Sequence, residues 1–331
     1  MMYLSRLLVD VGHDPDKHRP GRNWLRDIYA VHQRLCMAFP DKKRETDDAP
    51  FLAPHRTDDF RVARLTSNTA VREQRSSTAG LLFRIDPIMT QFSEHDRLDG
   101  DEQHEYARAM ILVLSAQQPN WEYAFQNSRM LLAAQPEQKR YEPEFKQGER
   151  YRFRILMNLS QKISQRKRKT PGKETYESLR TPHPEGKLDK KGRPKSQGKR
   201  ALLTWHKDTN PVQTIHPWFE MKAGVRAQKR VDGYVAEGAL IANRPFTLEE
   251  FALVKLGWVV GYKPKPKGKN SELPQPGPNY KVQHDTLRFR SALLEGVLRV
   301  EDAAAFTRLA LAGIGSAKAF GFGLLSLARM R

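Results

Sequence analysis

Residues 312–327, with the sequence AGIGSAKAFGFGLLSL, constrain the fold more than any other stretch of this chain. Four of these sixteen residues are glycines, and Lys318 lies among them. Glycine adopts positive φ readily and leaves its backbone N–H groups unshielded, so a loop of this composition can wrap closely around an anion. The stretch therefore predicts a turn between two regular elements, which either binds an anion or only connects those elements.

The residues on either side predict what the glycine stretch connects. Glu301 and Asp302, followed by the apolar sequence AAAFTRLAL, favour a short helix that ends at Gly313. Residues 322–327 predict a buried strand. The stretch does not have the order of a P-loop, because no strand leads into it and no Gly-Lys-Ser/Thr opens a following helix. A glycine-rich sequence is a weak signal by itself, so its function depends on the rest of the chain.

The charge of the chain narrows the class of partner. Its 331 residues contain 57 Lys and Arg against 38 Asp and Glu, a formal net charge of +19, which favours a polyanion and nucleic acid first. The single cysteine, Cys36, excludes an intrachain disulfide and a zinc site built from several cysteines. The sequence has no HxxxH or HExxH pair. We therefore expect no metal and no cofactor.

Nothing in the sequence indicates a membrane. The N-terminal apolar run contains charges and has no small-residue cleavage site, so it does not resemble a signal peptide. We find neither a strongly amphipathic basic helix nor a lipidation signal. The expectation is a soluble, cytoplasmic protein.

The first half of the chain predicts the order strand, helix, strand, strand, helix, strand. The best helix covers residues 23–39, in which apolar side chains recur at i, i+4, i+7 and i+11, and Pro40 ends it. A short helix begins over 121–125. The predicted strands cover residues 3–9, 60–65, 81–85, 110–114 and 141–145. This is the order of a ferredoxin-like domain.

The same order recurs in the second half. A helix is predicted over 217–231, and a last helix begins at Glu301. The predicted strands cover residues 151–156, 234–241 and 286–300. We therefore predict an α+β fold of two tandem ferredoxin-like, or RRM-like, domains with long basic loop insertions. The domains cover residues 1–146 and 147–331.

The longest insertion, residues 161–200, has fourteen Lys or Arg and only four Asp or Glu, a net charge of +10. A segment with so few apolar residues cannot bury enough surface to order itself, so we expect a solvated loop that is suited to bind phosphates. Residues 263–278 form a second basic, Pro/Gly-rich loop.

Within the helix over 23–39, Tyr29 and His32 lie at the rim of the apolar stripe, at i and i+3 on one face. A single histidine at a helix rim is usually a half-buried packing residue. Spacing alone therefore does not assign either residue to a reaction.

Three stretches together resemble the CasE family, the endoribonuclease of type I-E CRISPR systems that cuts precursor CRISPR RNA and belongs to the Cascade complex. They are the strand YLSRLLVD, the helix segment RDIYAVHQRLCMAFP and the tail GIGSAKAFGFGLLSL. The middle of the chain resembles the family more loosely, at residues 112–116, at Phe153-Arg154 and at DKKGRPKSQGKRALL. The chain departs from a compact member in its long loops at 12–22, 84–105 and 161–200.

The resemblance implies metal-independent cleavage of RNA beside a repeat stem-loop, with the RNA and other Cascade subunits as partners. The ribose 2′-hydroxyl attacks the adjacent phosphate, giving a 2′,3′-cyclic phosphate or 3′-phosphate and a 5′-hydroxyl. In the family pattern His32 is the catalytic histidine, Tyr29 supports it, and Lys318 acts near the scissile phosphate. The RNA contacts expected are Gly315, Ser316, Lys318, Arg26, Arg152, Arg154 and Lys162.

Two other classes of protein remain open. A non-catalytic RNA-binding protein would use tandem RRM-like sheets, but the strand YRFRIL lacks the aromatic density of an RRM stacking surface. A metal-dependent nuclease would need clustered carboxylates, whereas the acidic residues here are scattered through loops. Loss of cutting in EDTA would identify the metal-dependent nuclease, and absence of any cutting would identify the non-catalytic RNA-binding protein.

Overall fold

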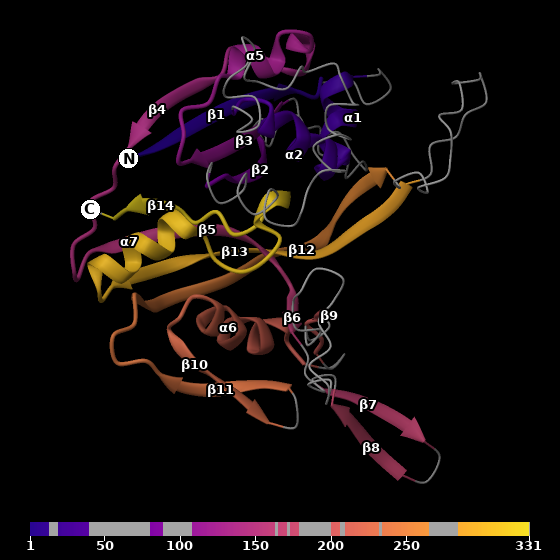
Figure 1. Ribbon diagram of the computed structural model, residues 1–331. Helices are drawn as coiled ribbons and strands as arrows, with labels where there is room; N and C mark the ends of the chain where they lie inside the picture. The colour runs from indigo at the N-terminus through magenta and orange to yellow at the C-terminus, as the bar shows by residue number, and fades with distance from the viewer. Residues whose placement is uncertain are drawn as a thin grey trace, which may run out of the picture. The chain divides into compact units, whose positions relative to one another are not determined.

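The computed structural model describes a chain that forms two compact units (Figure 1). The described residues are 1–12, 19–39, 80–88, 108–162, 165–170, 173–178, 200–205, 209–231, 234–264 and 284–330. The first unit comprises 1–143, 258–289 and 317–324, and the second comprises 144–257, 290–316 and 325–331. This division differs from the predicted boundary after residue 146, because two later segments group with the first unit.

The first unit is built on one four-stranded antiparallel sheet, with the strand order β2-β3-β1-β4. Its strands are β1 (Met2–Asp10), β2 (Leu82–Ile88), β3 (Arg108–Ser115) and β4 (Glu137–Tyr141). Its helices are α1 (Pro20–Arg26), α2 (Ile28–Cys36), α5 (Trp121–Phe125) and the short η3 (Arg129–Leu131). Leu7, Phe83 and Ile111 are fully buried in a core that also contains Val31 and Leu35 of α2. The helices therefore cover the apolar face of the sheet.

The second unit repeats this plan, with the strand order β12-β13-β5-β14. Its strands are β5 (Arg150–Asn158), β12 (Phe246–Pro264), β13 (His284–Val300) and β14 (Ser326–Arg329). Its helices are α6 (Pro211–Lys222) and α7 (Ala303–Ala312). Phe153 and Ile155 of β5 share a core with Phe219 of α6 and Phe306 of α7. In each sheet the strands follow the order second, third, first, fourth, so the prediction of two ferredoxin-like units is confirmed.

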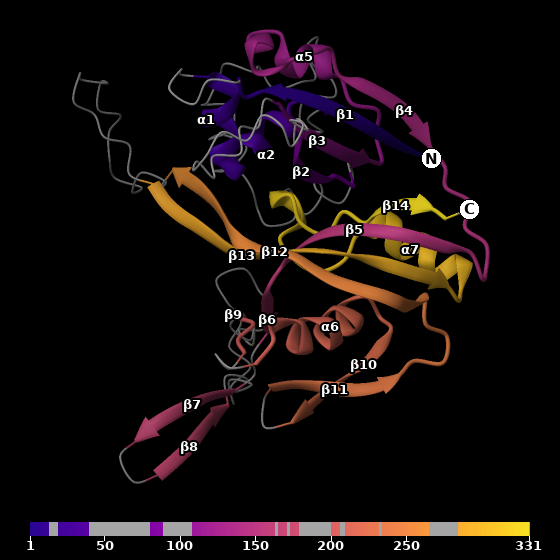
Figure 2. The ribbon, with the colours of Figure 1, turned by 180° about the vertical axis from the view of Figure 1, so that it is seen from behind.

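Three pairs of strands are added to the second unit. They are β10 (Arg226–Val231) with β11 (Tyr234–Leu240), β6 (Ser160–Lys162) with β9 (Arg200–Leu202), and β7 (Gln165–Thr170) with β8 (Lys173–Ser178). The pair β10–β11 lies beside α6 in both views (Figures 1 and 2). Seven strands predicted from the sequence match strands of the structure: 3–9, 81–85, 110–114, 151–156, 234–241, 286–300 and, at its last two residues only, 322–327. The helix over 121–125 and the helix that ends at Gly313 are also confirmed.

The prediction that residues 161–200 form only a loop was wrong, because β7 and β8 lie within this range. The register of this hairpin places Arg166 opposite Glu177 and Lys169 opposite Glu174. A count of net charge over the segment does not reveal this pairing.

Two element boundaries predicted from the sequence were wrong. The helix expected over 217–231 is α6, which begins at Pro211, where Asn210 accepts a hydrogen bond from the N–H of Val212, and ends before Gly224 at φ 75°. The strand expected over 141–145 is β4, which ends at Tyr141, two residues before Pro143. Proline has no N–H to donate to a strand ladder. The strand predicted over 60–65 and most of the loop over 263–278 lie outside the described residues.

Within the part of the chain that the structure describes, no helix is long and apolar enough to cross a membrane.

Candidate active site

The single helix predicted over 23–39 was wrong, because the chain breaks at Asp27 into α1 and α2. Asp27 is extended, with φ −108° and ψ 94°. Its carboxylate Oδ1 accepts hydrogen bonds from the N–H of Tyr29, at 3.0 Å, and from the N–H of Tyr262 in β12, at 2.9 Å. A carboxylate at this position caps the helix and interacts favourably with its dipole. Asp27 therefore fixes the start of α2 and joins it to β12.

His32 lies in the middle of α2, and its side chain is half-buried. Its ring centroid lies 5.7 Å from that of Phe320, with the ring planes at 55°. One turn later, the Sγ of Cys36 lies 3.6 Å from Nδ1 and 3.7 Å from Nε2 of His32. The imidazole is thus contacted by a thiol and by an aromatic ring, neither of which imposes a fixed charge on it. The sequence pattern assigns no role to Cys36 at this position, although its i, i+4 spacing from His32 is visible in the sequence.

Tyr29 is buried, with 6% of its surface exposed, so its predicted place at the rim of the helix was wrong. Its ring is stacked on Phe320, with centroids 6.4 Å apart and planes at 29°. β12, which the sequence analysis did not predict, covers this side of α2. A Cβ atom at Gly261 would lie 2.9 Å from Ile28 and 3.1 Å from the Tyr29 nitrogen, so only glycine allows this close approach.

The second part of the glycine stretch forms the short helix η4 (Lys318–Phe320), which contacts α2 and β2. Ala317 precedes it at φ 61°, the one positive φ of a non-glycine residue among the described residues. Backbone strain of this kind costs on the order of 1 kcal/mol and often occurs at functional sites. Gly321 follows at φ 82°, where a Cβ atom would lie 3.2 Å from the ring of Phe83. These two residues hold Phe320 against Tyr29 and His32.

Lys318 is half-buried, and burial lowers the pKa of its ammonium group. The charged form has lost part of its hydration, so an anion bound beside it would restore favourable electrostatics. Lys318 lies two residues before Phe320, whose ring contacts both Tyr29 and His32. The structure therefore brings three predicted catalytic residues onto two contacting elements of the first unit.

The first part of the glycine stretch belongs to the second unit. The Ser316 hydroxyl lies 3.3 Å from Nδ2 of Asn158, which donates to it, and 3.1 Å from the Ser160 hydroxyl. Gly315, at φ 87°, lies so close to Met157 that a Cβ atom would be 2.9 Å from its Cε. Gly315 and Ser316 are thereby attached to the carboxyl end of β5. Their predicted contact with RNA remains a prediction.

The four basic residues besides Lys318 that are predicted to bind RNA differ in their surroundings. Arg26 is exposed at the last position of α1. Arg152 and Arg154 are exposed on β5, on the face opposite the buried core residues. Arg154 is paired with Glu295 at 2.5 Å, whereas Arg152 has no acidic partner among the described residues. Lys162 is the last residue of β6.

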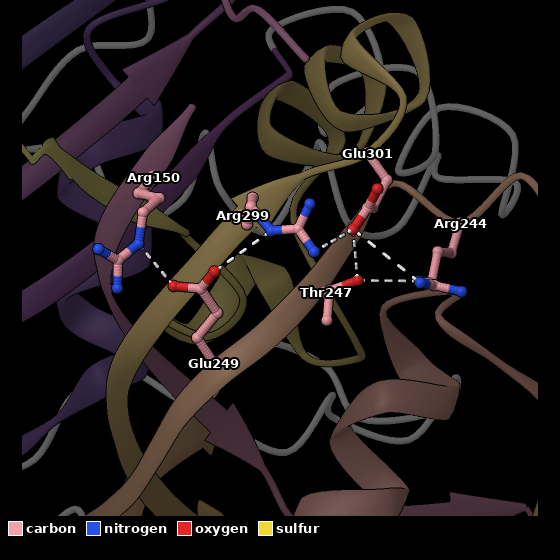
Figure 3. Close-up of polar contacts among 6 residues, drawn as sticks. All are labelled: Arg150, Arg244, Thr247, Glu249, Arg299 and Glu301. Atoms are coloured by element: carbon pink, nitrogen blue, oxygen red, sulfur yellow. Dashed lines mark hydrogen bonds and ion pairs between the residues drawn. The ribbon is translucent and has the colours of Figure 1, made fainter. Parts of the chain in front are cut away.

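Other arginines of the second unit are held in an ion-pair network (Figure 3). Glu249 of β12 pairs with Arg150 at 2.6 Å and with Arg299 at 3.2 Å. Glu301 pairs with Arg299 at 3.1 Å and accepts a hydrogen bond from Thr247 at 2.7 Å. Arg244 donates a hydrogen bond to Thr247 and pairs with Glu301. These arginines link β5, β12 and β13 to the start of α7, so Arg152 is distinguished from them by having no such carboxylate.

Among the described residues, no group of three or more His, Cys, Asp or Glu side chains is arranged to hold a metal ion.

Together these observations define an α+β protein of two ferredoxin-like units, with a histidine and a lysine on contacting elements of the first unit. A family model described as CRISPR associated protein matches residues 2–329. The chain belongs to this family, and the resemblance drawn from its three sequence stretches is confirmed at this level. None of the curated proteins compared with the chain matches it.

Solved structures of CRISPR endoribonucleases resemble the chain over nearly its whole length. CRISPR endoribonuclease Cse3 bound to a 19-nucleotide RNA has 16% identity and a TM-score of 0.50, and 99% of each chain is covered. Thermus thermophilus Cse3, bound to an RNA representing a pre-cleavage complex, has 18% identity and a TM-score of 0.48, with 99% of this chain and 98% of that chain covered. Cas6e from Escherichia coli str. K-12 has 18% identity and a TM-score of 0.39, with 99% and 100% covered. At 16% identity, the similarity to the first of these structures shows only that the fold is shared.

Proposed function

We propose that this chain is a metal-independent endoribonuclease that cuts precursor CRISPR RNA within its repeat, beside the stem-loop, and keeps the product as a Cascade subunit in the cytoplasm. Membership of the CRISPR associated protein family over residues 2–329 supports the biological setting. The fold shared with Cse3, described as an endoribonuclease bound to RNA, supports the reaction class. The observation that carries the proposal is the half-buried His32 beside the element that bears Lys318.

In the proposed reaction the ribose 2′-hydroxyl attacks the adjacent phosphorus, and the bond to the 5′-oxygen breaks. The products are a 2′,3′-cyclic phosphate or 3′-phosphate and a 5′-hydroxyl. His32 accepts the 2′-hydroxyl proton or donates a proton to the leaving 5′-oxygen, because histidine side chains titrate near neutrality. Both assignments are open.

Lys318 stabilises the charge that accumulates on the phosphorane oxygens. Its ammonium group is partly desolvated, and a cation in such surroundings interacts more strongly with a developing charge than one in bulk water. The N–H groups of the glycine stretch add to this effect.

Tyr29 acts here as a positioning residue. Its ring is buried and stacked on Phe320, which in turn contacts the imidazole of His32. We assign RNA binding outside the reacting phosphate to Arg26, Arg152, Arg154, Lys162, Gly315 and Ser316. Most contacts of this type are made to phosphates and fix the position of the RNA.

The test is incubation of the protein with repeat RNA from a neighbouring CRISPR array, in EDTA, followed by analysis of both product ends. We expect one cut beside the stem-loop, a cyclic or 3′-terminal phosphate upstream and a 5′-hydroxyl downstream. Cutting that requires a divalent metal would contradict the mechanism. Tight binding of the repeat without any cutting would instead identify a non-catalytic RNA-binding protein.

A further inference from the structure

The parts of β12 and β13 that belong to the first unit have two different faces. On the inner face, Val259 and Phe289 pack against the core, and Gly261 lies against α2. On the outer face, Trp258 and Tyr262 are 50% and 45% exposed. Two large aromatic side chains four residues apart on a strand point to the same side. The two exposed rings therefore lie on the same face of β12.

Arg288 of β13 lies on this outer face beside Trp258. The guanidinium carbon of Arg288 is 5.1 Å from the centroid of the indole ring, a cation–π contact. Within the described ranges no carboxylate forms an ion pair with Arg288.

A second arginine–tryptophan pair provides a contrast. Arg290 lies 3.9 Å from the centroid of Trp205, donates a hydrogen bond to the Leu203 carbonyl, and Trp205 packs against the core of the second unit. That pair is structural, because both partners are engaged in packing or hydrogen bonding. Trp258, in contrast, presents half of its surface to solvent.

The ligand best suited to this face carries both a flat π-system and a negative charge. Bases stack on aromatic rings regardless of sequence, and arginine adds attraction to the backbone phosphates. The net charge of +19 favours a polyanion over a protein of mixed charge. The strand that carries this face is joined to the helix of the candidate active site, because the backbone N–H of Tyr262 donates to Asp27, the cap of the helix that carries His32.

We propose that Trp258, Tyr262 and Arg288 form a stacking platform for an unpaired RNA base, separate from the residues that perform cleavage. The proposal rests on the proposed function only in taking RNA as the ligand. A base held on this face would fix the single strand beside the stem-loop.

The experiment measures the affinity of the full chain for fluorescently labelled decauridylate, a single-stranded RNA without a repeat sequence. Trp258→Ala should weaken binding by about 5- to 150-fold, the range expected for one lost base–aromatic stack. Trp258→Phe should stay within a few-fold of the parent, because a phenyl ring still stacks. Met130→Ala is the matched control, since Met130 is an apolar side chain of the same unit that is 65% exposed.

Melting temperatures of all variants should agree with that of the parent, because the substituted side chains are exposed. Equal affinity of Trp258→Ala and the parent would overturn the proposal, as would a parent that does not bind decauridylate. Unchanged RNA affinity with loss of co-purifying Cascade subunits would assign the face to a protein interface instead. Decauridylate need not be cut, so this binding test remains valid even if the proposed cleavage mechanism is wrong. A normal cleavage rate of Trp258→Ala would not support the platform if its affinity for decauridylate equals that of the parent.

Discussion

The two ferredoxin-like units each carry a histidine on a helix between the first and second strands of their sheet, and the two histidines have different neighbours. His32 on α2 lies beside the thiol of Cys36 and the ring of Phe320. His216 on α6 lies 3.9 Å from the carboxylate of Glu220 and 4.8 Å, between centroids, from the ring of Phe251. In both helices the polar neighbour is at i+4.

The groups around the two histidines differ in their charge and in their partners. Glu220 is buried and accepts a hydrogen bond from Arg226, so the surroundings of His216 include an ion pair. Around His32 the terminal glycine stretch supplies an aromatic ring and, two residues earlier, a partly desolvated lysine. If the proposed function holds, the chemistry of the neighbours, and not the position in the fold, separates a histidine that takes part in cleavage from one that does not.

Apart from the two histidines themselves, the largest effect in this comparison is expected at Lys318. Lys318→Ala should lower the single-turnover cleavage rate by about 10²- to 10³-fold, the usual loss for one group that stabilises transition-state charge. RNA affinity should also fall, because a phosphate contact is lost. The matched control is Lys222→Ala on α6, whose ammonium lies 5.9 Å from the ring of Trp218. Equal rates for the two variants would remove Lys318 from the reaction.

A smaller effect is expected at the two i+4 neighbours. Cys36→Ala should lower the cleavage rate by about 2- to 12-fold with little change in melting temperature, because one contact that orients the imidazole is lost. Glu220→Gln should lower the melting temperature and leave the rate near that of the parent, because a buried ion pair is broken. Rates and melting temperatures measured on both variants give this crossed pattern. The reverse pattern, in which Glu220→Gln lowers the rate and Cys36→Ala lowers the melting temperature, would contradict the assignment of α2 to the reaction and of α6 to the structure.

The smallest effect concerns the phosphate contacts with RNA that we assign to arginines of the second unit. Arg152→Ala should reduce the slope of log affinity against log salt by about 0.7 to 0.9, which corresponds to one lost phosphate contact. Arg154→Ala should reduce the slope less, because Arg154 is already paired with Glu295. Titrations of repeat RNA at several salt concentrations measure both slopes. An equal reduction would mean that Glu295 releases Arg154 on binding.

The sequence predicted most strands of the two sheets because these strands are apolar or alternate clearly, as in MILVL and YRFRIL, but the strand predicted over 234–241 is β11, which pairs with β10 outside the second sheet. It did not predict the break at Asp27, since the apolar spacing continues across it and the capping carboxylate is recognised only with its donors in place. It also did not predict β12, and with it the burial of Tyr29, because close packing at Gly261 is a contact between residues distant in the chain.

The candidate site was predictable in its residue types and not in its arrangement. The family resemblance points to His32 in a helix and to Lys318 in a glycine stretch at the opposite end of the chain. Phe320, which joins these two elements, carries no distinguishing signal in the sequence. Its position depends on the positive φ of Ala317 and Gly321, and glycine composition indicates only that such angles are available.

The most direct test of the account compares the alanine variants of the two histidines. Single-turnover cleavage of repeat RNA is measured in EDTA, with affinity and melting temperature determined on the same preparations. His32→Ala should cut about 10²- to 10⁴-fold more slowly than the parent, the range for lost acid–base catalysis, with nearly unchanged affinity. His216→Ala should cut within a few-fold of the parent. A near-normal rate for His32→Ala together with a lowered melting temperature would show that His32 is a packing residue and would contradict the central claim.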